Sequence, residues 1–207
     1  MTEDGNLAIP LRRSPRLFVG STMELFGDWI KKEWLENIFE KVTYYKNTTF
    51  IFLTKQPQNL IKWSPFPENC WVGVTATGYK TFYKALDKLR WIEAKVKFIS
   101  VEPLLEAIPL CSERLTSCGI KRTYKFWLII GQQTPVSKKT EPKIEWIREI
   151  VEAADKAGIP VFLKDNLRRL LPIEEPYYKL IVSNPEWGNA NYELRQEFPK
   201  SKELSHA

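Results

Sequence analysis

The chain has 207 residues, of which 43% are hydrophobic and 27% are charged. These proportions are ordinary for a globular protein, exclude a disordered or fibrous one, and allow one well-buried core. No apolar run approaches the roughly 20 residues that a membrane span needs, and residues 1–10 lack the pattern of a signal peptide. We therefore expect no membrane association and a cytoplasmic location.

The net charge of +6 is compatible with a nucleic-acid partner, although the positive residues are scattered along the chain. Cys70, Cys111 and Cys118 give no even disulfide framework and suit a reducing compartment. The chain has no C-x-x-C motif, and its single histidine, His206, lies beside the C-terminus. We therefore expect this chain to encode neither an iron–sulfur cluster site nor a zinc site.

Apolar stretches of strand type alternate with helical patterns along the chain. The expected strands cover residues 16–21, 50–53, 71–74, 97–101, 126–130 and 160–163. Amphipathic spacing predicts helices over residues 31–45, around 82–89 and over 142–157, with a short helical piece near residue 60. The Ser- and Thr-rich residues 111–118 are expected to form a loop.

This order predicts an α/β fold with about six parallel βα units. The units could form an open doubly wound sheet or an incomplete barrel, and polar residues at nearly every strand end favour a partial TIM-like barrel. We expect an irregular lead-in over residues 1–15, the partial barrel over 16–172, and a C-terminal extension over 173–207. That extension would pack on the barrel and end in disorder.

The strand at residues 97–101 shows the pattern most clearly. Its apolar body ends in Ser100, and Glu102 and the strand-breaking Pro103 follow at once. A carboxylate at such an end is costly to bury without a partner. In parallel sheets, ligands bind at the carboxyl ends of the strands.

The strand ends together predict one ligand-binding rim that suits a polar organic ligand. Its candidate residues are Ser21, Thr54, Lys55, Thr75, Ser100, Glu102, Gln132, Gln133, Lys164 and Asp165. Each has an alternative role: the threonines could cap helices, Glu102 could pair with a rim lysine, and the lysines could extend into solvent. Gly73 and Gly131 are expected to permit close packing or a tight turn.

Several longer motifs carry a family resemblance. They lie at residues 17–27, 52–57, 69–75, 100–105, 129–134, 162–165 and 194–199. Over residues 16–199 the chain resembles a phage- and prokaryote-associated family of unknown function, whose members look like partial TIM barrels related to radical S-adenosylmethionine enzymes.

The resemblance implies that Thr54, Lys55, Thr75, Ser100 and Glu102 line a site for S-adenosylmethionine or for a substrate. Members of that family typically begin with further strands and a cysteine cluster that holds iron and sulfur, and this chain starts after that region. Radical chemistry would then require a cluster-binding region or partner. The chain could be a truncated or split gene product, a subunit that a partner completes, or a domain that keeps the barrel as a binding site. An incomplete barrel also leaves an open edge, which we expect a partner protein or a second copy of the chain to cover.

Two other functions remain open from the sequence. The chain could be a nucleic-acid-binding module that uses its basic surface. It could also be a barrel lyase or aldolase that forms a Schiff base through Lys55 or Lys164.

Overall fold

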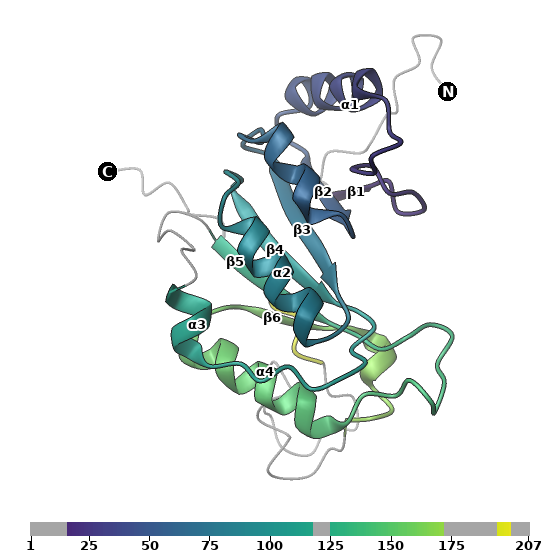
Figure 1. Cartoon of the computed structure of the whole chain (residues 1–207), viewed down its shortest axis with the longest axis vertical. Coiled ribbons are helices and arrows are strands. Elements are labelled where there is room, and N and C mark those ends of the chain that lie inside the picture. The colour runs from purple at the N-terminus through teal and green to yellow at the C-terminus, as the bar shows by residue number, and fades with distance from the viewer. Residues whose placement is uncertain (1–15, 118–124, 172–193, 200–207) are drawn as a thin grey trace.

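The computed structural model describes residues 16–117, 125–171 and 194–199. Six strands form one sheet in sequential order, and all five pairings between neighbours are parallel (Figure 1). The strands are β1 (Arg16–Val19), β2 (Thr49–Thr54), β3 (Cys70–Ala76), β4 (Val96–Val101), β5 (Lys125–Ile130) and β6 (Val161–Leu163). The predicted parallel α/β fold is therefore confirmed.

Helices follow the strands, most of them at the expected places. They are α1 (Lys32–Tyr44), the 3₁₀ helix η1 (Pro57–Trp63), α2 (Tyr79–Leu89), α3 (Ser112–Ser117), α4 (Ile144–Ala157) and the 3₁₀ helix η2 (Asp165–Leu167). The loop expected at 111–118 is wrong for residues 112–117, which form α3. Leu115 in α3 is fully buried in the main core, and this tertiary packing overrides the weak helix propensity of serine and threonine.

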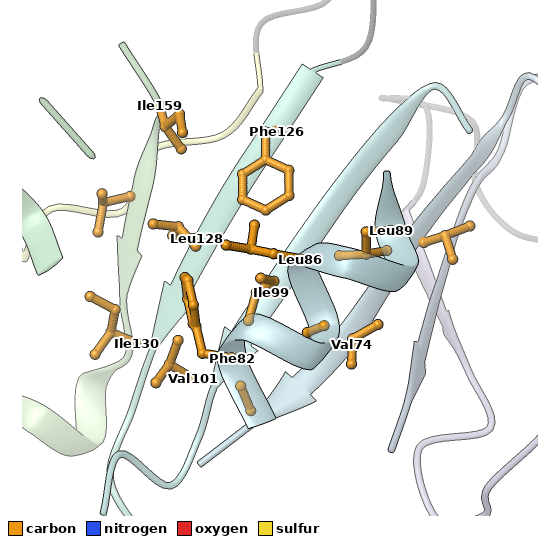
Figure 2. Packing of buried hydrophobic residues seen from close by; sticks show 14 of the residues in the cluster. Val74, Phe82, Leu86, Leu89, Ile99, Val101, Phe126, Leu128, Ile130 and Ile159 are labelled. Atoms are coloured by element: carbon orange, nitrogen blue, oxygen red, sulfur yellow. The ribbon is translucent and has the colours of Figure 1, made fainter. Parts of the chain in front are cut away.

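The main core lies between one face of the sheet and the helices. In α2, Phe82 and Leu86 pack over Ile99 and Leu128 of the central strands, as Figure 2 shows. The hydrophobic positions of α2 and α4 recur at helical spacing, so each helix presents one apolar face to the sheet. We call the opposite side of the sheet the inner face.

The inner face carries a second, aromatic cluster. Val96, Phe98 and Trp127 are buried there, and Trp71 and Phe162 are partly buried against them. Trp127 is at the centre, with ring centroids 5.6 Å from Phe98 and 5.7 Å from Trp71. Both sides of the central strands are therefore covered, as their continuous apolar sequences predict.

A segment near the C-terminus, residues 194–199, covers the edge of the sheet at β6. Its bridge to Phe162 is antiparallel, and Leu163 donates a backbone hydrogen bond to the carbonyl of Arg195 at 2.8 Å. Trp127 Nε1 also donates to the carbonyl of Glu197 at 2.8 Å. Because of these bonds, the backbone groups of this edge are not exposed as a template for another strand.

Arg195 fixes this segment to α4. Its guanidinium lies 2.6 Å from Asp155 and 3.0 Å from Glu197, with only 12% of its side chain exposed. Burial alone would lower the pKa of Arg195, but the bonds to the two carboxylates outweigh it and raise that pKa. The charged form is therefore favoured in the folded chain.

Contacts across the inner face show that the sheet is curled into a half-barrel. The guanidinium carbon of Arg16 in β1 lies 3.9 Å from the ring centroid of Phe198, which stacks on Trp127 of β5 at 5.3 Å. In a flat sheet, β1 and β5 would be roughly 19 Å apart, at about 4.8 Å per neighbouring strand. The curl brings all the carboxyl ends of the strands around one rim.

The edge at β1 differs from the edge at β6. Leu17 and Phe18 are 45% and 44% exposed, although they point to opposite faces of the sheet. The expectation that a partner protein or a second copy covers this edge stays a prediction.

Within the described part of the chain, no helix is long and apolar enough to cross a membrane. The expected cytoplasmic location stays a prediction. So does the division into lead-in, barrel and extension, because residues 1–15 and most of 173–207 lie outside the described residues.

The close packing expected at Gly73 leads to a stability prediction. A Cβ at this position would lie 2.3 Å from the ring of Phe98. We expect Gly73→Ala to lower the free energy of unfolding, measured in urea, by about 1–3 kcal/mol through overpacking. The matched control is Gly158→Asn, since Gly158 has φ 67° and nothing within 4 Å, and asparagine tolerates that conformation. Equal stability losses in the two variants would contradict the prediction.

Candidate functional site at the carboxyl ends of the strands

At the rim, each of three neighbouring strands is extended by one residue whose backbone amide still hydrogen-bonds to the next strand. The amides of Glu102, Gly131 and Lys164 donate to the strands beside them, at 3.1, 3.0 and 2.9 Å. Glu102 follows β4, Gly131 follows β5 and Lys164 follows β6. Side chains alternate between the two faces of a strand. Each of these three residues lies two or four positions after an inner-face residue of its own strand (Phe98, Trp127 or Phe162), so all three are on the inner face.

Glu102 and Lys164 meet across Gly131. Lys164 Nζ lies 2.6 Å from Glu102 Oε1 and 2.8 Å from Glu102 Oε2, so the ammonium group bridges both carboxylate oxygens. A Cβ on Gly131 would lie 3.0 Å from atoms of both side chains. The expected close packing at Gly131 is therefore confirmed, and its missing side chain makes room for the ion pair.

Asn166 orients this pair and joins the two loops beside it. Its Nδ2 donates to the carbonyl of Gln132 at 2.8 Å, to Thr134 Oγ1 at 3.3 Å and to Glu102 Oε1 at 3.4 Å. Its Oδ1 accepts from the amide of Gln132 at 3.3 Å. Asn166 was not among the predicted site residues, although it directly follows Lys164 and Asp165 at a strand end, which was the available signal.

Gln132 is a buried member of the same network. Its side chain is 1% exposed, and its Nε2 donates to the carbonyl of Asn166. Among the described residues, Gln132 Oε1 has no hydrogen-bond donor. Such an acceptor is costly to leave unsatisfied, so this corner of the rim holds unused hydrogen-bonding capacity.

Thr75 and Ser100 lie on the inner face, one step from the rim toward the middle of the sheet. They are direct partners in the register of β3 and β4. Thr75 is partly buried and Ser100 is 4% exposed. Two hydroxyl groups therefore stand on the same face as Glu102 and Lys164.

Thr54 lies on the helix-facing side of the sheet. Its hydroxyl donates to Glu24 Oε1 at 2.5 Å and accepts from the amide of Gln56 at 2.8 Å. Glu24 Oε2 also accepts from the amide of Lys55 at 2.7 Å. The hydroxyl of Thr54 thus ties the loop after β1 to the end of β2, while the side chain of Lys55 is exposed.

The other predicted site residues lie around the rim. Ser21 is exposed in the turn after β1, and Gln133 is partly buried next to Gln132. Asp165 is exposed and accepts from Arg168 and Gln196, each at 3.3 Å. The structure thus groups Thr75, Ser100, Glu102 and Lys164 on the inner face. Ligand contact by any of the ten candidates stays a prediction.

An iron–sulfur cluster needs several cysteine thiolates close together. Among the described residues, no group of three or more histidine, cysteine, aspartate or glutamate side chains could hold a metal ion. Cys70 is buried and Cys111 is exposed, both as free thiols, and Cys118 lies outside the described residues. The described thiols therefore do not fit a cluster.

Comparison with known proteins identifies the family and no activity. Residues 1–168 match a family described as "Protein of unknown function (DUF5131)", so the chain belongs to this family. No curated protein and no solved structure gives a significant match. The expected links to phages and to radical S-adenosylmethionine enzymes stay predictions, as do the nucleic-acid and lyase alternatives.

Cys70, outside the rim, gives a prediction about pH. Burial raises the pKa of this thiol from 9.0 to about 12. Above pH 9 the unfolded chain loses the proton while the folded chain keeps it, so the free energy of unfolding should fall as pH rises toward 12. Between pH 8 and pH 10 we expect ionisation of this thiol in the unfolded chain to lower the free energy of unfolding by about 1 kcal/mol, measured by urea unfolding under reducing conditions. Cys70→Ala is the control and should lose less over that interval. An identical loss in both proteins would refute the assignment.

Proposed function

We propose that this member of the DUF5131 family binds a polar organic ligand at the carboxyl ends of its strands. The leading candidate is S-adenosylmethionine, which the family resemblance in the sequence motifs implies. The proposal assigns ligand contact to the inner-face residues Thr75, Ser100, Glu102 and Lys164.

The observation that carries this proposal is the ion pair between Glu102 and Lys164. The two side chains are 24% and 41% exposed, and pairs exposed to this degree contribute about 0–1 kcal/mol to stability. Yet Gly131 makes room for the pair and Asn166 orients it. A contribution this small to stability does not explain why neighbouring residues make room for the pair and hold it in one orientation, whereas a role in ligand binding does.

The groups at the rim suit the chemistry of S-adenosylmethionine. That compound combines an amino-acid moiety, a ribose with two hydroxyls and an aromatic base, and it supplies an electrophilic sulfonium when bound. Glu102 and Lys164 can take charged groups, while Ser100 and Thr75 can hydrogen-bond to hydroxyls. The aromatic cluster around Trp127 offers rings deeper on the same face.

Calorimetric titration of S-adenosylmethionine into the purified chain tests the proposal. We expect saturable binding that weakens about tenfold or more in Glu102→Gln and in Lys164→Met, since a charge-assisted hydrogen bond contributes about 1.5–3 kcal/mol. Lys80→Met, at an exposed position in α2, is the matched control and should bind like the unmodified chain. Urea unfolding of every variant confirms that it folds.

Two results would contradict the proposal. One is no binding by the folded, unmodified chain at millimolar ligand. The other is binding that both rim substitutions leave unchanged.

A further inference from the structure

We propose that the ion pair of Glu102 and Lys164 is a recognition site for the α-ammonium and α-carboxylate groups of an amino-acid moiety in the ligand. This inference rests on the proposed function, because it assumes that the ligand binds at the same rim. It goes further by stating which part of the ligand contacts these two residues.

The hydrogen-bonding capacity left in the pair supports this assignment. A lysine ammonium has three donors, and within the described part of the chain Lys164 donates one hydrogen bond, to Glu102 Oε2, with Oε1 2.6 Å away in the ion pair. At least one donor is therefore left for a ligand carboxylate. Among the described residues, Glu102 accepts hydrogen bonds from Lys164 and Asn166. Because an ionised carboxylate accepts about four hydrogen bonds, Glu102 can also accept one from a ligand ammonium.

The charges select the class of ligand. A plain anion at this position would be attracted by Lys164 but repelled by Glu102, and a plain cation would meet the reverse. An α-amino acid carries both charges on one carbon atom and matches both residues at once. Its two charge-assisted contacts balance the charges of both Glu102 and Lys164.

The surroundings hold the pair in one orientation. Asn166 Nδ2 reaches Glu102 Oε1 at 3.4 Å while it is anchored to the carbonyl of Gln132 at 2.8 Å. Gly131 is buried beneath the pair, and a single added methyl group there would lie 3.0 Å from both side chains. Because recognition of two charges on one carbon needs a fixed spacing, this arrangement suits a zwitterion better than a single diffuse charge.

Two commercially available nucleosides separate the amino-acid moiety from the rest of the ligand. S-adenosylhomocysteine and 5′-methylthioadenosine share the adenosine and the thioether, and only the first has an amino acid. By calorimetry we expect the unmodified chain to bind S-adenosylhomocysteine at least tenfold more tightly than 5′-methylthioadenosine. In Glu102→Gln and Lys164→Met, the ratio of the two dissociation constants should fall toward one, while the affinity for 5′-methylthioadenosine changes less than twofold.

Gly131→Ala supplies a second variant that keeps both charges. Since φ at Gly131 is not in the left-handed region, alanine fits the backbone, and its methyl group changes only the spacing of the pair. We expect it to weaken S-adenosylhomocysteine about fivefold or more and to spare 5′-methylthioadenosine. Lys80→Met again serves as the control.

The outcomes distinguish the inference from the proposed function. If both nucleosides bind the unmodified chain equally, or the rim variants weaken both equally, the inference is overturned while binding at the rim stands. If neither compound nor S-adenosylmethionine binds, the proposed function fails, and the inference fails with it. Loss of the selectivity ratio in all three rim variants supports the inference.

Discussion

The missing side chain at Gly131 is the constraint on which the rim of this protein depends. Glu102 and Lys164 come from strands that are not neighbours, since β5 runs between β4 and β6. The absence of a Cβ at the end of β5 leaves room for the two long side chains to meet over it at 2.6 Å, whereas an added Cβ would lie 3.0 Å from both of them. Gly131 thus lets one ion pair link β4 and β6 across β5. The backbone hydrogen bonds between these strands fix the position along the sheet at which the two side chains meet.

The rest of the half-barrel supports that rim. Helices cover one face of the sheet (Figure 1). The inner face is filled near its centre by the rings around Trp127. Residues 194–199 close the β6 edge, and Arg195 fastens them to α4. At the other edge, β1 exposes Leu17 and Phe18. Lys164 therefore follows a protected edge strand, which suits a residue whose position must be defined.

Much of this arrangement could be predicted from the sequence. The apolar strand bodies and the polar residue after each one predict both the parallel sheet and its rim, and the pairing of Glu102 with a rim lysine was one of the expected alternatives. Local patterns could not predict contacts between residues far apart in the chain. The bond from Thr54 to Glu24 spans 30 positions, and the bond from Asn166 to the carbonyl of Gln132 spans 34. Helix α3 was missed because burial of Leu115, rather than its composition, stabilises it.

The central claim is that a ligand binds at the rim beside Lys164, and lysine footprinting tests it most directly. The native chain would be acetylated briefly with and without S-adenosylmethionine, and the extent at each lysine read by peptide mass spectrometry. The account predicts that the ligand slows modification of Lys164 and leaves Lys80 in α2 unchanged. Protection at other lysines with Lys164 unaffected, under conditions where the ligand is bound, would contradict it.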